Sequence, residues 1–250
     1  MKKLMVALAL VVAHPVWAAD GPIAAAIASP SRPASHLALD AGRMPAEMLA
    51  LGGLKPGQTV LDVVPGGGYY TRLAALVAGP KGRVVALMPP PFMEDDAKAV
   101  TSWDALKAAH PTVELLLAMP GDAALPQPID LTIFHLTYHD LYWDSAKYRI
   151  PRMDPAAFLA KLYAATRPGG AVLVVDHVAP SGAEPRAEAE RSHRIDPAVV
   201  KADFLKAGFK LGDTSSVLAN PLDDHRKLVY DPEIRGKTDR FAWKFVKPER

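Results

Sequence analysis

The chain has 250 residues, of which 50% are apolar and 22% charged, so it can bury the core of one large domain or two small ones. It contains no cysteine, which excludes disulfides, lipidated cysteine and thiolate metal sites. Its formal charge of +2 falls to zero without Lys2 and Lys3, so no net charge draws it to nucleic acid or to an anionic membrane.

Residues 1–18 have the pattern of a secretory signal peptide. Two lysines precede the apolar run 4–13, and Val16 and Ala18 fit the −3 and −1 positions of a small-residue cleavage site. The run is too short to span a bilayer, so no stable membrane insertion is expected after cleavage. A buried N-terminal helix is disfavoured because Asp-Gly-Pro follows at residues 20–22. The pattern predicts an exported protein, periplasmic or secreted.

The rest of the chain alternates between strand and helix patterns. Residues 19–36 are expected to form a flexible leader or a loose first helix, and residues 37–51 one or two short helices. The polar insert 180–194 is expected to be a solvated loop or an exposed helix. Further helices are expected at 70–78, 94–109, 155–166 and 197–208. Strands are expected at 59–64, 83–87, 112–118, 130–136, 171–176, 209–218 and 240–246.

This alternation predicts an α/β fold. Continuous apolar strands separated by helices are typical of a parallel sheet that is covered on both faces. The last two strands have no helix between them, which favours an antiparallel end to the sheet. With no internal repeat or boundary, we expect a single domain over residues 37–250.

A glycine loop follows the first expected strand. Gly66, Gly67 and Gly68 lie between that strand and a helix, where backbone N–H groups can approach a ligand. A dinucleotide site is disfavoured, because Thr71 replaces the third small residue and Met88 stands where an acid would follow the second strand. No Gly-Lys-Ser/Thr or Gly-x-Ser-x-Gly sequence occurs, so neither a Walker loop nor a serine hydrolase is supported.

The histidines give no metal-binding motif. His135 and His139 are four residues apart, but Leu136 stands where a zinc protease has glutamate, and the pair spans a strand end. We therefore expect no metal site. The alternative left open is that His139, His177 and His225 meet in space.

An ordered set of motifs resembles class I S-adenosylmethionine-dependent methyltransferases, in particular a group of predicted exported bacterial ones. The motifs, which cover the chain from about residue 40, are Asp62-x-x-Pro65-Gly66-Gly67-Gly68-Tyr69-Tyr70-Thr71, Gly121-Asp122, Tyr138-His139-Asp140-Leu141, Arg167-Pro168-Gly169-Gly170, Asp176-His177, His193-Arg194-Ile195-Asp196, Asp223-Asp224-His225 and the segment 231–239. The resemblance implies a Rossmann-like, doubly wound, seven-stranded sheet with an antiparallel last strand.

The resemblance also implies S-adenosyl-L-methionine as the cofactor. Its methionine part would lie at Asp62 and the glycine loop, with Asp122 facing the adenine amino group and Ala123 against the ring. The cofactor-binding positions implied are Asp62, Pro65, Gly66, Gly67, Gly68, Tyr69, Met88, Gly121, Asp122, Ala123 and His135.

Two positions depart from the pattern of this class. Val64 replaces the usual first loop glycine, and Pro65 is expected to hold it in extended geometry. Met88 replaces the acid that binds the ribose hydroxyls, which removes two charge-assisted hydrogen bonds and lowers the expected affinity.

The catalytic segment implied is Tyr138, His139 and Asp140, in which His139 would be the base for the nucleophile's proton. An equal alternative is that Tyr138 and His139 pack and orient the loop. His177 beside Asp176 fits either a second contact layer of the site or a turn histidine bonded to the backbone. The tail motifs around His193, His225 and Arg235 fit either a rim of the site or structural ties.

Two functions remain open on this evidence. The first is methyl transfer to a small-molecule acceptor. The second is an exported, non-catalytic protein that binds a small molecule on a methyltransferase fold.

Overall fold

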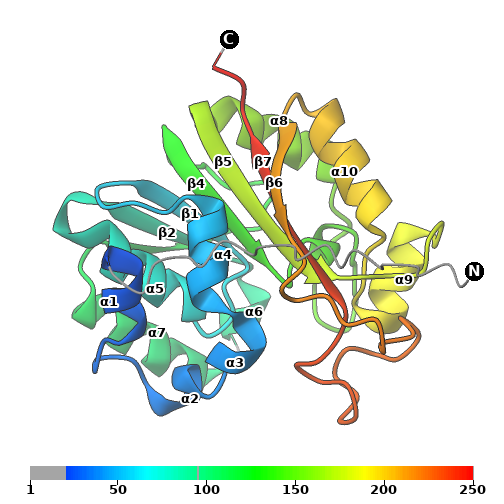
Figure 1. Ribbon diagram of the computed structural model, residues 1–250, viewed down its shortest axis with the longest axis horizontal. Coiled ribbons are helices and arrows are strands. Elements are labelled where there is room, and N and C mark those ends of the chain that lie inside the picture. The colour runs from blue at the N-terminus through cyan, green and yellow to red at the C-terminus, as the bar shows by residue number, and fades with distance from the viewer. Residues whose placement is uncertain (1–20, 95, 250) are drawn as a thin grey trace, which may run out of the picture.

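The alternating apolar segments form one seven-stranded sheet. A computed structural model describes residues 21–94 and 96–249, and its strands lie in the order β3-β2-β1-β4-β5-β7-β6 (Figure 1). The first five strands are parallel, and β7 runs antiparallel to both β5 and β6. The strands are β1 (Thr59–Val63), β2 (Arg83–Met88), β3 (Val113–Leu117), β4 (Ile129–His135), β5 (Thr166–His177), β6 (Lys210–Ser215) and β7 (Arg240–Val246). The expected α/β fold with its reversed last strand is confirmed.

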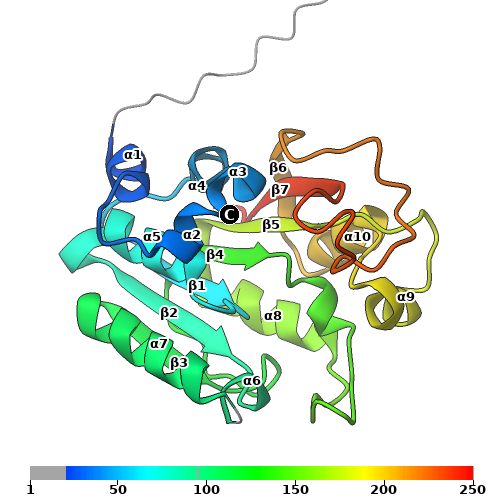
Figure 2. The ribbon, with the colours of Figure 1, turned by 90° about the horizontal axis from the view of Figure 1, so that it is seen from below.

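Helices cover both faces of the sheet (Figure 2). Alternation within a strand divides the core: Val84 and Ala86 of β2 face one helical layer, and Val85 faces the other. The first layer contains α1 (Pro22–Ile27), α4 (Pro45–Gly52), α5 (Tyr69–Ala78) and α7 (Ala97–Ala109). The second contains α8 (Pro155–Ala165) and α10 (Pro197–Lys206). Shorter elements are α2 (Ala34–Leu37), α3 (Asp40–Arg43), α6 (Pro91–Glu94), α9 (Pro185–Ser192), η1 (Gly79–Lys81) and η2 (His139–Leu141).

Of the two alternatives for residues 19–36, a flexible leader or a loose first helix, the structure shows a helix from residue 22. Ala26 of α1 is buried in the core, and the buried Arg32 makes two hydrogen bonds to the Asp40 carboxylate. The Tyr69 hydroxyl donates to the same carboxylate, which ties the segment to the first turn of α5. Sequence patterns did not reveal this order because the ties are tertiary. The expected signal peptide lies outside the described residues.

The polar insert is also more buried than expected. Its helix, α9, places Ala189 and Ser192 fully inside the protein and leaves only 7% of Glu188 exposed. Glu188 pairs with Arg191 and accepts a hydrogen bond from the Ser192 hydroxyl, so its charge is compensated where it is buried. The expectation of a solvated loop or exposed helix is corrected to a helix with one buried face.

One other expected helix is divided. The segment 94–109 forms the end of α6 and then α7, because Asp96 caps α7 by accepting hydrogen bonds from the N–H groups of Lys98 and Ala99. None of the helices in the described residues is both long and apolar enough to cross a bilayer.

Candidate functional site

The glycine loop joins the carboxyl end of β1 to the start of α5. Gly66 and Gly68 have φ of +55° and +74°, conformations that side chains other than glycine adopt at a cost. A Cβ on Gly68 would lie 2.6 Å from Leu106 Cδ1, whereas a Cβ on Gly67 would meet no protein atom within 4 Å. Gly68 therefore permits close packing of helix on loop, and Gly67 leaves open space above the loop.

Val64 does not have the extended geometry expected before Pro65. Its φ is +53°, in the left-handed region, while its N–H still donates to the Leu87 carbonyl of β2. The sheet hydrogen bond and the buried side chain hold Val64 in place while the chain turns into the loop, and a β-branched residue is strained there. Leu136 and His193 are also left-handed, and all three residues line the cavities described next.

Two adjoining cavities, of about 500 and 760 Å³, open above the carboxyl ends of β1 and β4. They share several lining residues, including Gly66, Gly67 and Thr137. The smaller cavity is the more polar of the two, and its lining includes Arg43, Asp62, His135, His139 and His177. Apolar groups predominate in the larger one, which is lined by Met88, Phe92 and Trp103 together with Asp140 and His193.

Asp62 and Arg43 place opposite charges in the smaller cavity. Asp62 is 2% exposed and accepts a hydrogen bond of 2.6 Å from the Thr71 hydroxyl. Burial raises the pKa of Asp62 to about 6, although Thr71 and Arg43 act in the opposite direction. Burial lowers the pKa of Arg43, whose guanidinium lies 4.5 Å from the centroid of the Tyr69 ring. Among the described residues that guanidinium has no hydrogen-bond or ion-pair partner.

His135 contributes an unpaired polar atom to the same cavity. Its Nε2 is buried without a hydrogen-bond partner among the described residues, and its ring lies 4.5 Å from that of Tyr70. Burial lowers the pKa of His135 well below its usual value, so the ring is neutral. A neutral imidazole offers a ligand one donor and one acceptor.

A second polar cluster surrounds His139. Its Nδ1 lies 2.9 Å from Asp176 Oδ1, and its Nε2 lies 3.4 Å from Asp140 Oδ1 and 3.3 Å from His193 Nδ1. Burial would lower the pKa of His139, but the charges of Asp176 and Asp140 outweigh it and raise that pKa to about 9. His139 and Asp140 thus reach the cavities, but a pKa of about 9 leaves His139 protonated near neutral pH, which does not suit the base expected at this position.

Tyr138 turns away from both cavities. It is fully buried, donates a hydrogen bond of 2.8 Å to Asp203 and packs against Phe134 and Phe204. Burial raises the pKa of its hydroxyl well above the usual value, so the phenol is neutral. These contacts agree with the packing alternative for Tyr138.

Three positions implied for adenine binding lie elsewhere. Gly121, Asp122 and Ala123 line neither cavity, and the Lys161 ammonium donates to the carbonyls of Gly121 and Ala123. Met88 does line the larger cavity, and so does Asp96.

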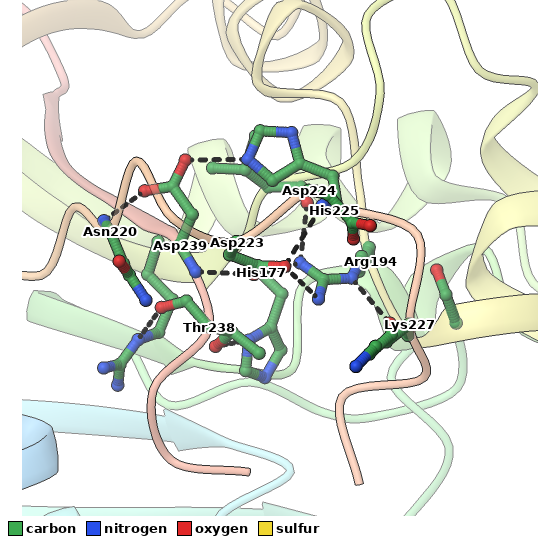
Figure 3. A network of polar contacts seen from close by, with 12 residues as sticks. His177, Arg194, Asn220, Asp223, Asp224, His225, Lys227, Thr238 and Asp239 are labelled. Atoms are coloured by element: carbon green, nitrogen blue, oxygen red, sulfur yellow. Dashed lines mark hydrogen bonds and ion pairs between the residues drawn. The ribbon is translucent and has the colours of Figure 1, made fainter. Parts of the chain in front are cut away.

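The tail loop between β6 and β7 is tied down by the polar network of Figure 3. Arg194 makes two hydrogen bonds to Asp223, and the Asp239 N–H donates to the same carboxylate (Figure 3). His225 pairs with the Asp239 carboxylate at 2.9 Å, away from His139, so the His225 motif is a structural tie. His177 bonds through Nδ1 to the Thr238 hydroxyl at 2.6 Å rather than to backbone.

This loop also delivers Tyr230 to both cavities. Neither Tyr230 nor Arg43 was among the sequence-predicted site residues. Tyr230 comes from an irregular loop and Arg43 ends the four-residue helix α3, and only the folded chain places them beside the glycine loop.

No protein-family model and no curated protein sequence matches the chain. Its fold is similar to that of a SAM-dependent methyltransferase from Aquifex aeolicus, with a TM-score of 0.57, 22% identity and coverage of 86% of this chain and 98% of that one.

Two further solved structures extend this likeness. Aeropyrum pernix fibrillarin, in complex with natively bound S-adenosyl-L-methionine, has a TM-score of 0.51 at 13% identity and covers 83% of this chain and 76% of that one. The [4+2]-cyclase SpnF has a TM-score of 0.57 at 15% identity, covering 83% of this chain and 81% of that one. At sequence identities this low, the likeness shows a similar fold alone.

Proposed function

We propose that this protein is an S-adenosylmethionine-dependent methyltransferase that acts on a small-molecule acceptor. One observation carries the proposal. Above the glycine loop, a cavity with a buried carboxylate and a guanidinium adjoins a cavity with apolar lining. These are the groups that an amino-acid zwitterion and an adenosine require at the two ends of one ligand.

The residues that line the two cavities suit the separate parts of this cofactor. The Asp62 carboxylate suits the ligand's ammonium group, and the Arg43 guanidinium suits its carboxylate. Met88 and Trp103 offer apolar contact to the adenosine. The open space over Gly67 allows the ligand to approach the backbone closely.

Asp96 is our candidate to replace the missing ribose acid. Its side chain caps α7 through one carboxylate oxygen, Oδ1, and lines the same cavity as Met88. The second oxygen is left to accept hydrogen bonds from ribose hydroxyls.

Bound at this site, the cofactor supplies an electrophilic methyl group on a sulfonium. That group would be transferred to a nucleophilic atom of the acceptor in line with the carbon–sulfur bond, and the acceptor's proton would pass to solvent. The chain's contribution is to hold the acceptor in that line. Tyr230, Thr137 and His177 line the space beside the loop where an acceptor would lie, and a cavity volume of about 500 Å³ suits a small molecule.

Calorimetry with S-adenosylmethionine and S-adenosylhomocysteine tests the cofactor. We expect saturable binding to the wild type. Gly67→Ala is expected to weaken it about 10- to 100-fold without loss of stability, because the added methyl group fills ligand space and meets no protein atom. Unchanged affinity in Gly67→Ala, or no binding by the wild type, would contradict the proposal.

Gly68→Ala is the matched comparison for that variant. Here the methyl group meets Leu106 and a left-handed backbone, so the free energy of unfolding should fall by about 2–4 kcal/mol. Urea unfolding of both variants separates a blocked ligand site from a damaged fold.

Methyl transfer from the labelled cofactor to extract components distinguishes an enzyme from a non-catalytic binding protein. We expect transfer that is lost in Gly67→Asp. Binding without transfer would favour the alternative, and the likeness to a cyclase shows that one fold serves different reactions.

We also propose that the protein acts outside the cytosol, on the pattern of residues 1–18. Sequencing of the mature N-terminus should give Ala19 as the first residue. A variant with Lys2 and Lys3 replaced by glutamate should accumulate as precursor. Recovery of the uncleaved wild-type chain from the cytosolic fraction would refute export.

A further inference from the structure

Three metal-ligating side chains converge where the two cavities meet. His139 and Asp140 lie in η2, and His193 caps the end of α9. Their ligand atoms all lie within 4.8 Å of one another. The cluster joins two segments that are far apart in the sequence, so no metal-binding motif spacing predicts it.

Two of the three distances within this cluster, both measured from His139 Nε2, match the spacing of metal ligands. His139 Nε2 lies 3.4 Å from Asp140 Oδ1 and 3.3 Å from His193 Nδ1. Both are longer than the roughly 2.9–3.0 Å of a good N–H···O hydrogen bond. Ligand atoms bound to Zn²⁺ at 2.0–2.1 Å in a tetrahedron lie about 3.3–3.4 Å apart.

Asp176 supports His139 as a ligand. Its carboxylate lies 2.9 Å from His139 Nδ1 and is itself held by the backbone N–H groups of His139 and His177. A metal ion would displace the Nε2 proton that the pKa of about 9 keeps on His139, and the hydrogen bond from Nδ1 to the carboxylate would then fix the ring and direct the Nε2 lone pair into the cluster. Metal-ligating histidines generally have this kind of partner.

The charges of the cluster also favour a cation. Asp140 and Asp176 place two carboxylates around one imidazole, and no Lys or Arg of the described residues forms an ion pair with either. The Asp140 carboxylate accepts no hydrogen bond from the described part of the chain, apart from its contact with His139. Protonated His139 compensates one of these two charges, and a divalent cation that displaced its proton would compensate both.

Aromatic neighbours hold His193 in place. Its backbone is left-handed, with φ of +54°, and its ring packs between those of Trp143 and Tyr230 at 5.4 and 5.2 Å. A strained backbone conformation persists only where surrounding contacts hold it, and such residues are concentrated at functional sites. All three candidate ligands line a cavity, which leaves a side of the cluster open.

We propose that His139 Nε2, the Asp140 carboxylate and His193 Nδ1 bind one divalent transition-metal ion of the zinc class. Two imidazoles and a carboxylate with an open position are typical of catalytic rather than structural metal sites. The open position faces the cavity and takes water or an oxygen or nitrogen atom of the second substrate. This metal binding is independent of whether S-adenosylmethionine occupies the glycine loop.

Metal titration of the full, chelator-stripped chain tests the site. Co²⁺ serves as the spectroscopic probe, because its visible absorption reports coordination geometry, and Zn²⁺ should displace it. We expect one ion per chain. His193→Ala and Asp140→Asn should each weaken Co²⁺ binding by about 100-fold or more, and Asp176→Asn by about 10- to 100-fold.

His110→Ala is the control histidine. It lies at the end of α7 beside Arg72, away from the cluster, and should leave both stoichiometry and spectrum unchanged. Circular dichroism verifies that each variant is folded. Absence of saturable Co²⁺ or Zn²⁺ binding by the wild type, or wild-type affinity in both His193→Ala and folded Asp140→Asn, would overturn the assignment.

Discussion

Asp223→Ala is expected to lower the free energy of unfolding by about 3–5 kcal/mol, because it leaves the charge of Arg194 buried without its partner. Both side chains are almost completely inaccessible, at 0% and 1% exposed, and two hydrogen bonds of 2.9 and 3.1 Å join them. The remaining acceptors of the guanidinium are the carbonyls of Val178 and Lys227, which carry no compensating charge (Figure 3).

Urea unfolding of Asp223→Ala beside Asp213→Ala measures this effect. Asp213 also forms an ion pair, with Lys244, but the pair is 3.4 Å apart and 77% of the Asp213 side chain is exposed. A surface pair of this kind contributes little, so the control should change stability by less than about 1 kcal/mol. Equal losses of unfolding free energy in the two variants would show that burial does not increase the contribution of the Arg194–Asp223 pair to stability.

The same variant should also loosen the tail loop. Asp223 accepts hydrogen bonds from the N–H groups of His225 and Asp239, which hold the two ends of the segment that carries Tyr230. Amide hydrogen exchange should therefore rise first within residues 216–239. Acceptor binding should weaken as well, because Tyr230 lines the space in which we place the acceptor.

The strands and the glycine loop were predictable because their signals are local. An apolar run such as Val60-Leu61 followed by Pro and Gly specifies a buried strand and a tight turn within a dozen residues. Residue Asp154 before Pro155 likewise identified the start of α8, where its carboxylate accepts hydrogen bonds from the N–H groups of Ala156 and Ala157. In these cases the neighbouring residues alone set the geometry.

The site could be predicted only in part, because its side chains come together through tertiary contacts. The loop, Asp62 and the segment after β4 were found from strand ends, but Arg43, Asp96 and Tyr230 were not. The extended backbone predicted for Val64 was wrong for a related reason. A local rule for residues before proline favours extended backbone, and here a sheet hydrogen bond and a buried side chain override it.

Asp62→Asn is expected to stabilise the ligand-free protein above pH 7 while weakening cofactor binding. The folded-state pKa of Asp62 is about 6, above its ordinary value of 3.8, because burial penalises the carboxylate. The folded protein therefore holds this proton more tightly than the unfolded chain, and the wild type loses stability as pH rises from about 4 to 6. At 1.36 kcal/mol for each pKa unit, the loss is about 3 kcal/mol above that window.

The amide avoids this loss because it carries no charge, and its oxygen still accepts the hydrogen bond from Thr71. The free energy of unfolding of the variant should exceed that of the wild type by about 1–3 kcal/mol at pH 8, and this difference should vanish near pH 4. Urea unfolding at several pH values measures this difference, with Asp213→Asn on the exposed edge strand as the control. A difference independent of pH would contradict the burial of a charged Asp62. A stabilised variant whose S-adenosylmethionine affinity falls at least about 10-fold would mean that this carboxylate is kept, at a cost in stability, for the ligand's ammonium group.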